Sequence, residues 1–203
     1  MRTIKASTFI SLDGVMQAPG GPEEDPVAGF KFGGWTVPFW NEDGMDDIMD
    51  DIFSKPYDLL LGRKTYDIFA DYWPRHADNP IGEQFNAATK YVATSSPDTL
   101  AWQNSRPLGN DIIGALRELK KQDGPDLLLQ GSSQLAHALF ASDLIDKFTL
   151  LVFPVLLGKG KRLFDDKAMP VTLRQTRSHT SSSGVFSATY ERAGEVKTGS
   201  FAD

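Results

Sequence analysis

Four short segments of the sequence place glycine or hydroxyl residues where a strand is expected to give way to a turn or a helix. They are SLDG at 11–14, GRKT at 62–65, TSS at 94–96 and GSS at 131–133. Such corners leave backbone N–H groups without partners, and the start of a helix favours negative charge. Glycine lets the backbone approach an anion closely, and arginine can bind a phosphate through two parallel hydrogen bonds. The four segments therefore indicate a site for a phosphorylated ligand.

Two of these segments suit different parts of one dinucleotide. Residues 131–133 suit a pyrophosphate at the start of a helix. A monoester phosphate of the same ligand would bind one strand away, at Arg63, Lys64, Ser95 and Ser96. The GxGxxG fingerprint is absent, and cations and hydroxyls stand where an acidic residue would bind a ribose 2′-hydroxyl, so NADPH is predicted rather than NADH. The alternative for Arg63 is a surface ion pair with Asp67, four residues further along the same helix.

Alternating strands and helices must position these segments. Apolar and β-branched runs predict strands over 3–10, 57–61, 90–94 and 126–129, with a short extended piece near 100–103. Helical periodicity predicts helices over 45–52, 63–72, 83–88 and 111–121, and another from residue 132 onward. In open α/β sheets ligands collect at the carboxyl ends of the strands, which is where the four segments fall.

The last third of the chain has a different pattern. Strands are predicted over 147–155, 171–178 and 185–191, with no helical pattern between them, so these strands must largely pair antiparallel. The sequence therefore predicts an α/β fold with three α/β/α layers, a mostly parallel mixed sheet and antiparallel C-terminal strands. We expect a single domain over 1–192, followed by a flexible tail over 193–203.

Composition excludes several classes of protein. The 203 residues have a net charge of −6 and no cysteine, which excludes thiolate chemistry and Cys-containing zinc sites. The basic clusters are too short for a nucleic-acid groove, and no apolar run is long enough for a signal peptide or a membrane span, so a cytoplasmic protein is expected. The histidines lie far apart with no ligand spacing, and no metal is predicted; they are His76, His137 and His179.

The order of five motifs resembles the dihydrofolate-reductase-like family. They are SLDG, LLLGRKTYD, VATSS, LLLQGSSQL and DKFTLLVFPVLLGKGKRLF, and they are most similar to the branch that includes the reductase domain of riboflavin biosynthesis, the C-terminal domain of the bifunctional deaminase-reductase. The resemblance covers residues 4–164. It implies a dihydrofolate-reductase-like fold and a reductase that binds NADPH in an extended pose.

The resemblance also implies a place for each cofactor contact. The adenosine phosphate would lie near Gly62, Arg63, Lys64, Thr65, Ser95 and Ser96. The pyrophosphate would lie at Gly131, Ser132 and Ser133, and the nicotinamide by the segment from Ser11 to Gly14.

Candidate catalytic carboxylates follow from the same comparison. Folate reductases carry a carboxylate on the helix after the first loop, and Asp46, Asp47 and Asp50 all lie near that place, while Asp13 lies in the SLDG segment. The register of that helix is ambiguous by a couple of residues. The alternative is that Asp46 and Asp47, with Asp50 and Asp51, form a solvated helix face whose first-turn acids favour the helix dipole.

The long segment 17–41 is rich in Gly, Pro and aromatic residues and has no evident folate-reductase counterpart. Its Trp35 and Trp40 are predicted to contact the substrate, as is Lys159 in the turn GKGK. The alternatives are that the tryptophans anchor a core and that Lys159 belongs to an ordinary polar turn.

The function expected from these patterns is NADPH-dependent reduction of a small heterocyclic substrate, pteridine-like or phosphoribosylaminopyrimidine-like. The alternative is a non-catalytic nucleotide- or flavin-binding module with the same fold. The apolar run 148–157, expected near a sheet edge, suggests a homodimer or an oligomerisation scaffold.

Overall fold

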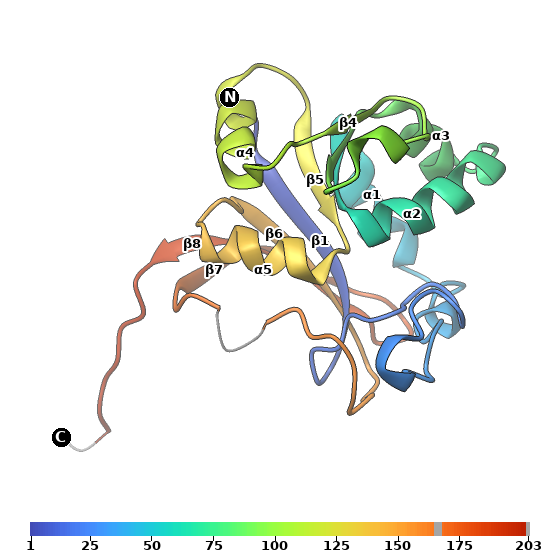
Figure 1. The fold of residues 1–203 in the computed structure, drawn as a ribbon. Helices are drawn as coiled ribbons and strands as arrows, with labels where there is room; N and C mark the ends of the chain where they lie inside the picture. The colour runs from blue at the N-terminus through green and yellow to red at the C-terminus, as the bar shows by residue number, and fades with distance from the viewer. Residues whose placement is uncertain (165–167, 202–203) are drawn as a thin grey trace.

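The protein is built on one eight-stranded sheet with strand order β4-β3-β2-β5-β1-β6-β8-β7 (Figure 1). The computed structural model describes residues 1–164 and 168–201. The strands are β1 (Ile4–Ser11), β2 (Tyr57–Gly62), β3 (Lys90–Ala93), β4 (Ser105–Pro107), β5 (Asp126–Gln130), β6 (Lys147–Phe153), β7 (Thr172–Thr180) and β8 (Phe186–Gly194). From β4 to β6 each pairing is parallel, whereas β6 with β8 and β8 with β7 are antiparallel. The predicted mixed sheet is confirmed.

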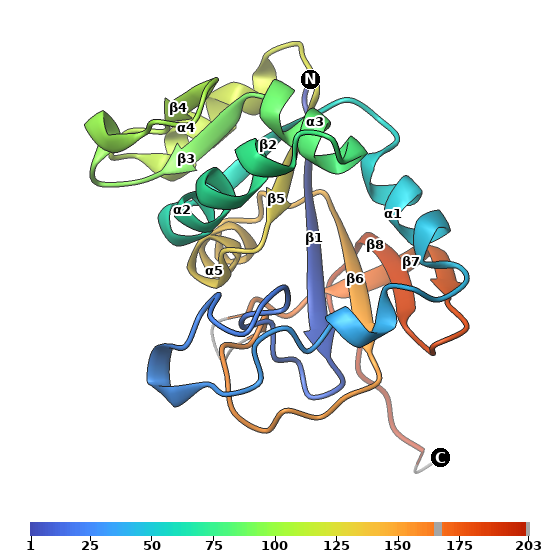
Figure 2. The ribbon, with the colours of Figure 1, turned by 90° about the vertical axis from the view of Figure 1, so that its right-hand side faces the viewer.

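Helices cover both faces of the sheet because side chains on a buried strand point alternately to either side. Leu59 and Leu61 of β2 pack with α1 (Met45–Phe53), α2 (Arg63–Tyr72) and α3 (Pro80–Ala87). Leu60, between them, packs with α4 (Ile112–Lys121) and α5 (Ser133–Ala141) on the other face. Figures 1 and 2 show the resulting three layers, which confirm the predicted α/β/α architecture.

The segment 17–41 folds back on the sheet and forms a core of its own. It contains two 3-10 helices, η1 (Val27–Gly29) and η2 (Val37–Phe39), and lies at the carboxyl end of β1 (Figure 2). Trp35 is 8% exposed, donates its indole N–H to the Gln17 carbonyl at 2.8 Å and packs edge-on against Phe153 of β6. Aromatic burial therefore fixes this segment against β6, which is why so glycine- and proline-rich a stretch is ordered.

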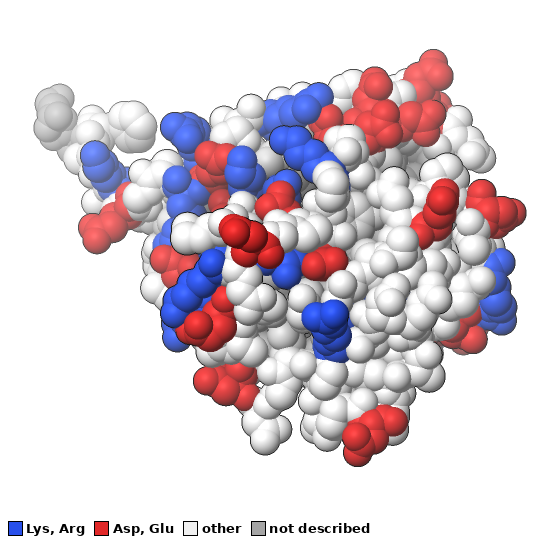
Figure 3. Space-filling model, turned by 90° about the horizontal axis from the view of Figure 1, so that it is seen from above, with Lys and Arg blue, Asp and Glu red and all other residues white. Residues whose placement is uncertain are grey.

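The amino ends of the strands are joined by a buried polar network. Arg2 is 5% exposed and forms an ion pair with Asp58 of β2, while its other N–H groups donate to the Pro125 carbonyl and to the Tyr91 hydroxyl. These contacts link the first residues of the chain to β2, to β3 and to the residue that directly precedes β5. On the outer surface above this end, basic and acidic side chains are interspersed (Figure 3).

Several element boundaries differ from those predicted: α3 starts three residues earlier, at Pro80, and larger differences concern the edge strand and the tail. The edge strand is β4 at Ser105–Pro107 and not the piece near 100–103. Trp102 is buried in the same core cluster as Val92 of β3, and Asn104 turns the chain with a φ of 60° before the chain pairs with β3. Strand β8 continues to Gly194, two residues into the predicted tail, whose flexibility stays a prediction and whose last two residues lie outside the described ones. The remaining 3-10 helices are η3 (Trp73–His76) and η4 (Pro97–Thr99).

Strand β6 is not at an edge of the sheet. It pairs with β1 on one side and with β8 on the other, so its backbone groups are used within the chain. The expectation that residues 148–157 lie near an open edge is therefore wrong, since the long hairpin of β7 and β8 covers that side. The edge strand there is β7, and the homodimer itself stays a prediction.

Candidate functional site

The two glycine corners at 62–65 and 131–133 meet at the carboxyl edge of the sheet. Strands β2 and β5 are parallel neighbours, so the corners that follow them lie side by side. The Gly62 amide donates to the Ser132 hydroxyl oxygen at 2.7 Å, and that hydroxyl donates to Thr65 Oγ1 at 2.8 Å. We call residues 62–65 and 131–133 together the helix junction, because α2 and α5 both start there.

The two corners of the helix junction approach each other so closely that positions 62 and 131 favour glycine. A Cβ atom at position 62 would lie 2.8 Å from the Ser132 hydroxyl, and one at position 131 would lie 3.3 Å from Thr65. Gly131 also has a φ of +57°, which L side chains rarely adopt. The first-turn N–H groups of α2 and α5 have no side-chain cap. The helix junction thus presents backbone donors and the positive ends of two helix dipoles at one place.

Arg63 extends from the helix junction toward the end of β3. Its Nε donates to both carboxylate oxygens of Asp67, at 2.9 and 3.0 Å, and its Nη1 donates to the Ser96 carbonyl at 3.2 Å and to Thr99 Oγ1 at 2.5 Å. The ion pair considered as an alternative therefore exists, and it coexists with the contact to the 94–96 segment. The exposed Ser95 lies in that segment. Nη2 has no hydrogen-bond partner within residues 1–164 and 168–201, so one donor edge of the guanidinium is free.

Lys64 points away from Arg63. Its ammonium group forms an ion pair with Asp25 of the 17–41 segment, and Lys161 donates to the other oxygen of the same carboxylate at 2.5 Å. The structure therefore brings Arg63 together with the 94–96 segment but does not bring Lys64 there. Consecutive residues of a helix point about 100° apart, which explains the divergence.

The SLDG segment forms a tight turn whose polar atoms are used within the protein. Asp13 accepts hydrogen bonds from the Ser11 hydroxyl at 2.6 Å, from the Leu157 amide at 3.1 Å and from the Gly158 amide at 2.8 Å. The bond from Ser11, with those from the two amides, lowers the pKa of Asp13 to about 2. Gly14 completes the turn with a φ of 81°. The geometry assigns Asp13 to holding the 154–162 turn, where its carboxylate is ionised at neutral pH, and the catalytic role expected for it stays a prediction.

The other two candidate acids do not face the sheet. Asp46 and Asp47 are exposed on the first turn of α1, whose buried side chains include Met45 and Ile48. The arrangement matches the alternative of a solvated helix face, because the apolar period places Met45 and Ile48 inward. A catalytic role for either carboxylate would need a substrate that reaches the outside of α1.

The three predicted substrate contacts lie in different settings. Trp35 is buried in the core of the 17–41 segment, as the alternative for it supposed. Trp40 is half-buried, donates to Thr36 Oγ1 at 3.1 Å and packs edge-on against Phe9 of β1. Lys159 is exposed in the turn after β6. Of the three, only Trp40 and Lys159 have surface that a ligand could contact.

Sequence reasoning missed several polar residues that the fold brings near the helix junction. Asp25 and Gln17 are buried in the 17–41 segment, and Ser7 and Gln130 are buried on neighbouring strands β1 and β5. Nothing local marks them, because each depends on a partner more than one hundred positions away or on its place in the sheet. The only available signal was a polar residue inside an otherwise apolar strand, as at Gln130.

A family model for the RibD C-terminal domain matches residues 2–187. The chain belongs to this family. The chain is 28% identical over 198 residues to the uncharacterized protein YyaP of Bacillus subtilis, covering 93% of this chain and 94% of that protein. It is 25% identical over 168 residues to the uncharacterized protein YwjB of the same organism, covering 81% and 84%.

Solved structures share the fold of this chain. A putative riboflavin biosynthesis protein from Shewanella has a TM-score of 0.63 at 19% identity, covering 94% of this chain and 99% of that one. A dihydrofolate reductase from Enterococcus faecalis complexed with NADP(H) has a TM-score of 0.59 at 17% identity, covering 94% and 96%. The predicted resemblance to dihydrofolate-reductase-like proteins is confirmed, and the family supports a reductase-type enzyme.

Within the described residues, no helix is long and apolar enough to cross a bilayer, and no group of three or more His, Asp or Glu side chains is placed to hold a metal ion.

Proposed function

We propose that this protein is an NADPH-dependent reductase that transfers a hydride to a small heterocyclic substrate, pteridine-like or phosphoribosylaminopyrimidine-like. The observation that carries the proposal is the helix junction, where two uncapped helix starts meet beside a guanidinium with a free donor edge. Phosphate groups bind at such positions because free N–H groups and helix dipoles favour negative charge. The fold shared with a reductase that was solved with NADP(H) adds support.

The residues present fit the phosphates of NADPH. Arg63 would bind the adenosine monoester phosphate through Nη2, since Nε and Nη1 already hold the guanidinium in place. The backbone of Gly131 and Ser132 and the hydroxyl of Thr65 would bind the pyrophosphate at the helix junction. NADPH, when bound, supplies the hydride. The task of this chain's own residues is then to bind, orient and exclude water, which needs no triad or metal cluster.

Two buried polar side chains favour a heterocycle with amide-like edges. Gln130 directly precedes Gly131 and is 8% exposed, and Ser7, its register partner on β1, is 2% exposed. Ser7 Oγ has no hydrogen-bond partner in the described part of the chain. A glutamine side chain carries both a donor and an acceptor, which complements the adjacent N–H and C=O groups of pterins and pyrimidines. A buried hydroxyl left without a partner is costly, so a ligand that pairs with it would gain affinity.

A titration of the purified protein with NADPH and NADH by calorimetry tests the cofactor. We expect NADPH to bind more tightly, because only NADPH carries the monoester phosphate. Equal affinities, or no binding of either, would refute the assignment. Nicotinamide absorbance would then be followed with a panel of pteridines, phosphoribosylated pyrimidines and quinones.

The second candidate is a non-catalytic nucleotide- or flavin-binding module. The observation that favours it is that the three predicted carboxylates offer no proton toward the sheet, since Asp13 is held ionised and Asp46 and Asp47 are exposed outside α1. Tight NADPH binding without oxidation of NADPH across the whole panel would support this candidate over the reductase.

A further inference from the structure

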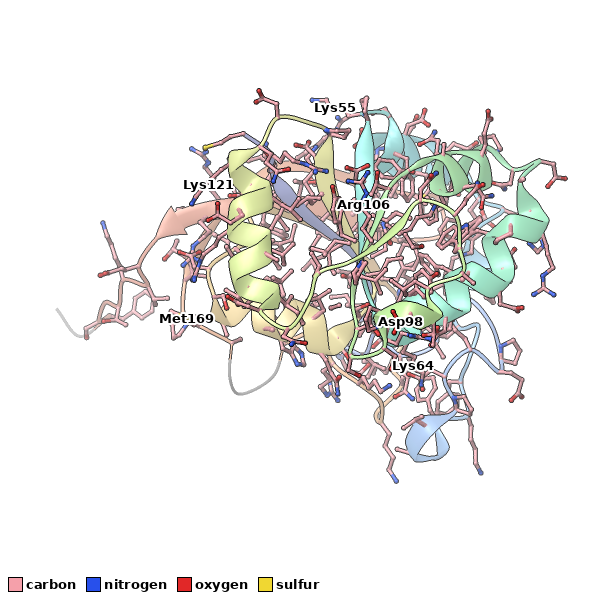
Figure 4. All side chains as sticks on the ribbon, turned by 45° about the horizontal axis from the view of Figure 1, so that its top comes forward. Lys55, Lys64, Asp98, Arg106, Lys121 and Met169 are labelled. Carbon is pink, nitrogen blue, oxygen red and sulfur yellow. The ribbon has the colours of Figure 1, made fainter. Side chains whose placement is uncertain are left out.

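A buried carboxylate of the 17–41 segment lies between two lysines from distant parts of the chain. The Asp25 side chain is 11% exposed and forms ion pairs with Lys64, in the first turn of α2, and with Lys161, in the turn after β6. Figure 4 shows Lys64 between the start of α2 and the 17–41 segment. One carboxylate thus joins three segments that are far apart in the sequence.

Gln17 holds this arrangement in place. Its side-chain amide donates to the Asp25 carbonyl at 2.8 Å and to the Val27 carbonyl at 3.0 Å, and its side-chain oxygen accepts from the Lys161 backbone amide at 3.0 Å. Gln17 is 4% exposed. The Asp25 carboxylate is therefore presented by a built scaffold and does not reach the lysines by chance from a mobile chain.

The charges around Asp25 leave an excess of positive potential. Asp25 pairs with both ammonium groups, and Glu24, which also interacts electrostatically with Lys64, is bonded to the Gly20 and Gly21 amides and to neither lysine, while the N-terminus of α2, with no side-chain cap, adds positive potential close to Lys64. A phosphoryl group carries more negative charge and more acceptor oxygens than a carboxylate. The two lysines therefore suit a phosphoryl group better than the group that they hold.

The ionised state of Asp25 makes it a competitor for anions. Burial opposes ionisation of this carboxyl, but the hydrogen bonds from Lys161 and Lys64 outweigh burial and lower the pKa of Asp25 below its usual value. Asp25 is thus negatively charged at neutral pH, and by pairing with both lysines it competes with other anions for them.

We propose that Lys64 and Lys161 form a phosphoryl-binding site that Asp25 occupies in the free protein, and that a phosphoryl group of the ligand displaces Asp25 and releases the 17–41 segment from the start of α2. The proposal rests on the proposed function for the identity of the natural ligand, the dinucleotide pyrophosphate next to the helix junction. The anion site itself can be tested without that ligand. The 17–41 segment also packs beside β6. Its release would therefore couple cofactor binding to the access of the substrate to its site.

The test compares the wild type with Asp25→Asn, using inorganic pyrophosphate as the probe in calorimetry at low salt. Asn keeps the shape of Asp25 but removes the competing charge, so pyrophosphate should bind about tenfold more tightly to the variant. Asp71→Asn is the matched control: it removes the same kind of charge, but Asp71 pairs with the exposed Arg75 and with neither lysine, so its replacement should leave pyrophosphate affinity unchanged.

Two further measurements separate displacement from a structural role. Limited proteolysis should cut the 17–41 segment of the wild type faster once pyrophosphate is added, and adding Lys161→Gln to Asp25→Asn should abolish the gain in affinity. Equal or weaker pyrophosphate binding by Asp25→Asn would overturn the proposal, even if NADPH binds. Tighter pyrophosphate binding by the variant, with no NADPH binding by either protein, would support the anion site and refute the proposed function instead.

Discussion

Replacing Arg63 with alanine should weaken NADPH binding selectively. The guanidinium is fixed by Asp67 and by the Ser96 carbonyl, which leaves the Nη2 edge for one or two charge-assisted hydrogen bonds to a monoester phosphate. A hydrogen bond to a charged group contributes about 1.5–3 kcal/mol, which corresponds to a loss of about 10- to 150-fold in affinity. Because Arg63 is already held in place, little side-chain entropy is lost on binding, and the upper part of this range is expected.

The assay is calorimetry with NADPH and with NADH on each variant. The affinity for NADH should be nearly unchanged, since NADH lacks the phosphate that Arg63 would bind. Arg75→Ala is a matched control, because Arg75 forms the same kind of i,i+4 ion pair, with Asp71, on an exposed stretch of the chain. It should alter neither affinity. Arg63→Lys should recover only part of the loss, because an ammonium cannot bind Asp67 and a phosphate in a fixed fork.

The result that would refute this reasoning is an NADPH-to-NADH affinity ratio that Arg63→Ala leaves unchanged. An equal loss of affinity for NADPH and for NADH would also contradict it. Such a result would mean that Arg63 supports the shape of the site and does not bind the monoester phosphate that only NADPH carries. The free energy of unfolding should be measured alongside. Arg63→Ala removes a partly exposed ion pair, so it should lower that free energy by less than about 1 kcal/mol.

Three further predictions concern the frame that holds the site. Arg2→Met leaves its buried carboxylate partner unpaired and should lower the free energy of unfolding, measured by urea denaturation, by about 3–5 kcal/mol. Lys121→Met, which breaks an exposed ion pair, should lower it by less than about 1 kcal/mol. Equal effects of the two substitutions would contradict the role of burial. The pKa of Asp13 is about 2 in the folded protein, below its ordinary value of 3.8, so its stabilising contribution is present above about pH 4 and is lost as the pH falls toward 2. The difference in unfolding free energy between the wild type and Asp13→Asn should shrink over that interval, and a constant difference would refute the assignment. Gly160→Ala brings a Cβ within 2.4 Å of a buried valine, whereas the Cβ added by Gly158→Ala meets nothing within 4 Å. Both substitutions carry the strain of a positive φ, about 1–2 kcal/mol, so Gly160→Ala should destabilise the protein clearly more. Similar unfolding midpoints in urea for the two variants would show that the turn adapts to the added methyl group.

The sequence alone determined the parts of this protein that depend on neighbouring residues. Apolar periods and glycine positions located the strands, the helices and the corners at 62–65 and 131–133, because strand and helix repeats are local properties. The same logic put both corners at the carboxyl edge of one sheet, since parallel strands must end on the same side. The resemblance of five ordered motifs supplied the fold and the family.

The tertiary structure decided where the side chains of those segments point and what they contact. Arg63 and Lys64 are adjacent in sequence, yet one extends toward the end of β3 and the other is held by Asp25, which lies 39 positions away. Asp13 had the chemistry of an acid catalyst, but the turn after β6 uses both of its oxygens. Trp35 was equally suited to a substrate platform until the fold placed Phe153 beside it. Partners at such separations follow from strand order and packing, which no local pattern encodes, so the sequence could define the corners of the site but not the contacts of each side chain within it.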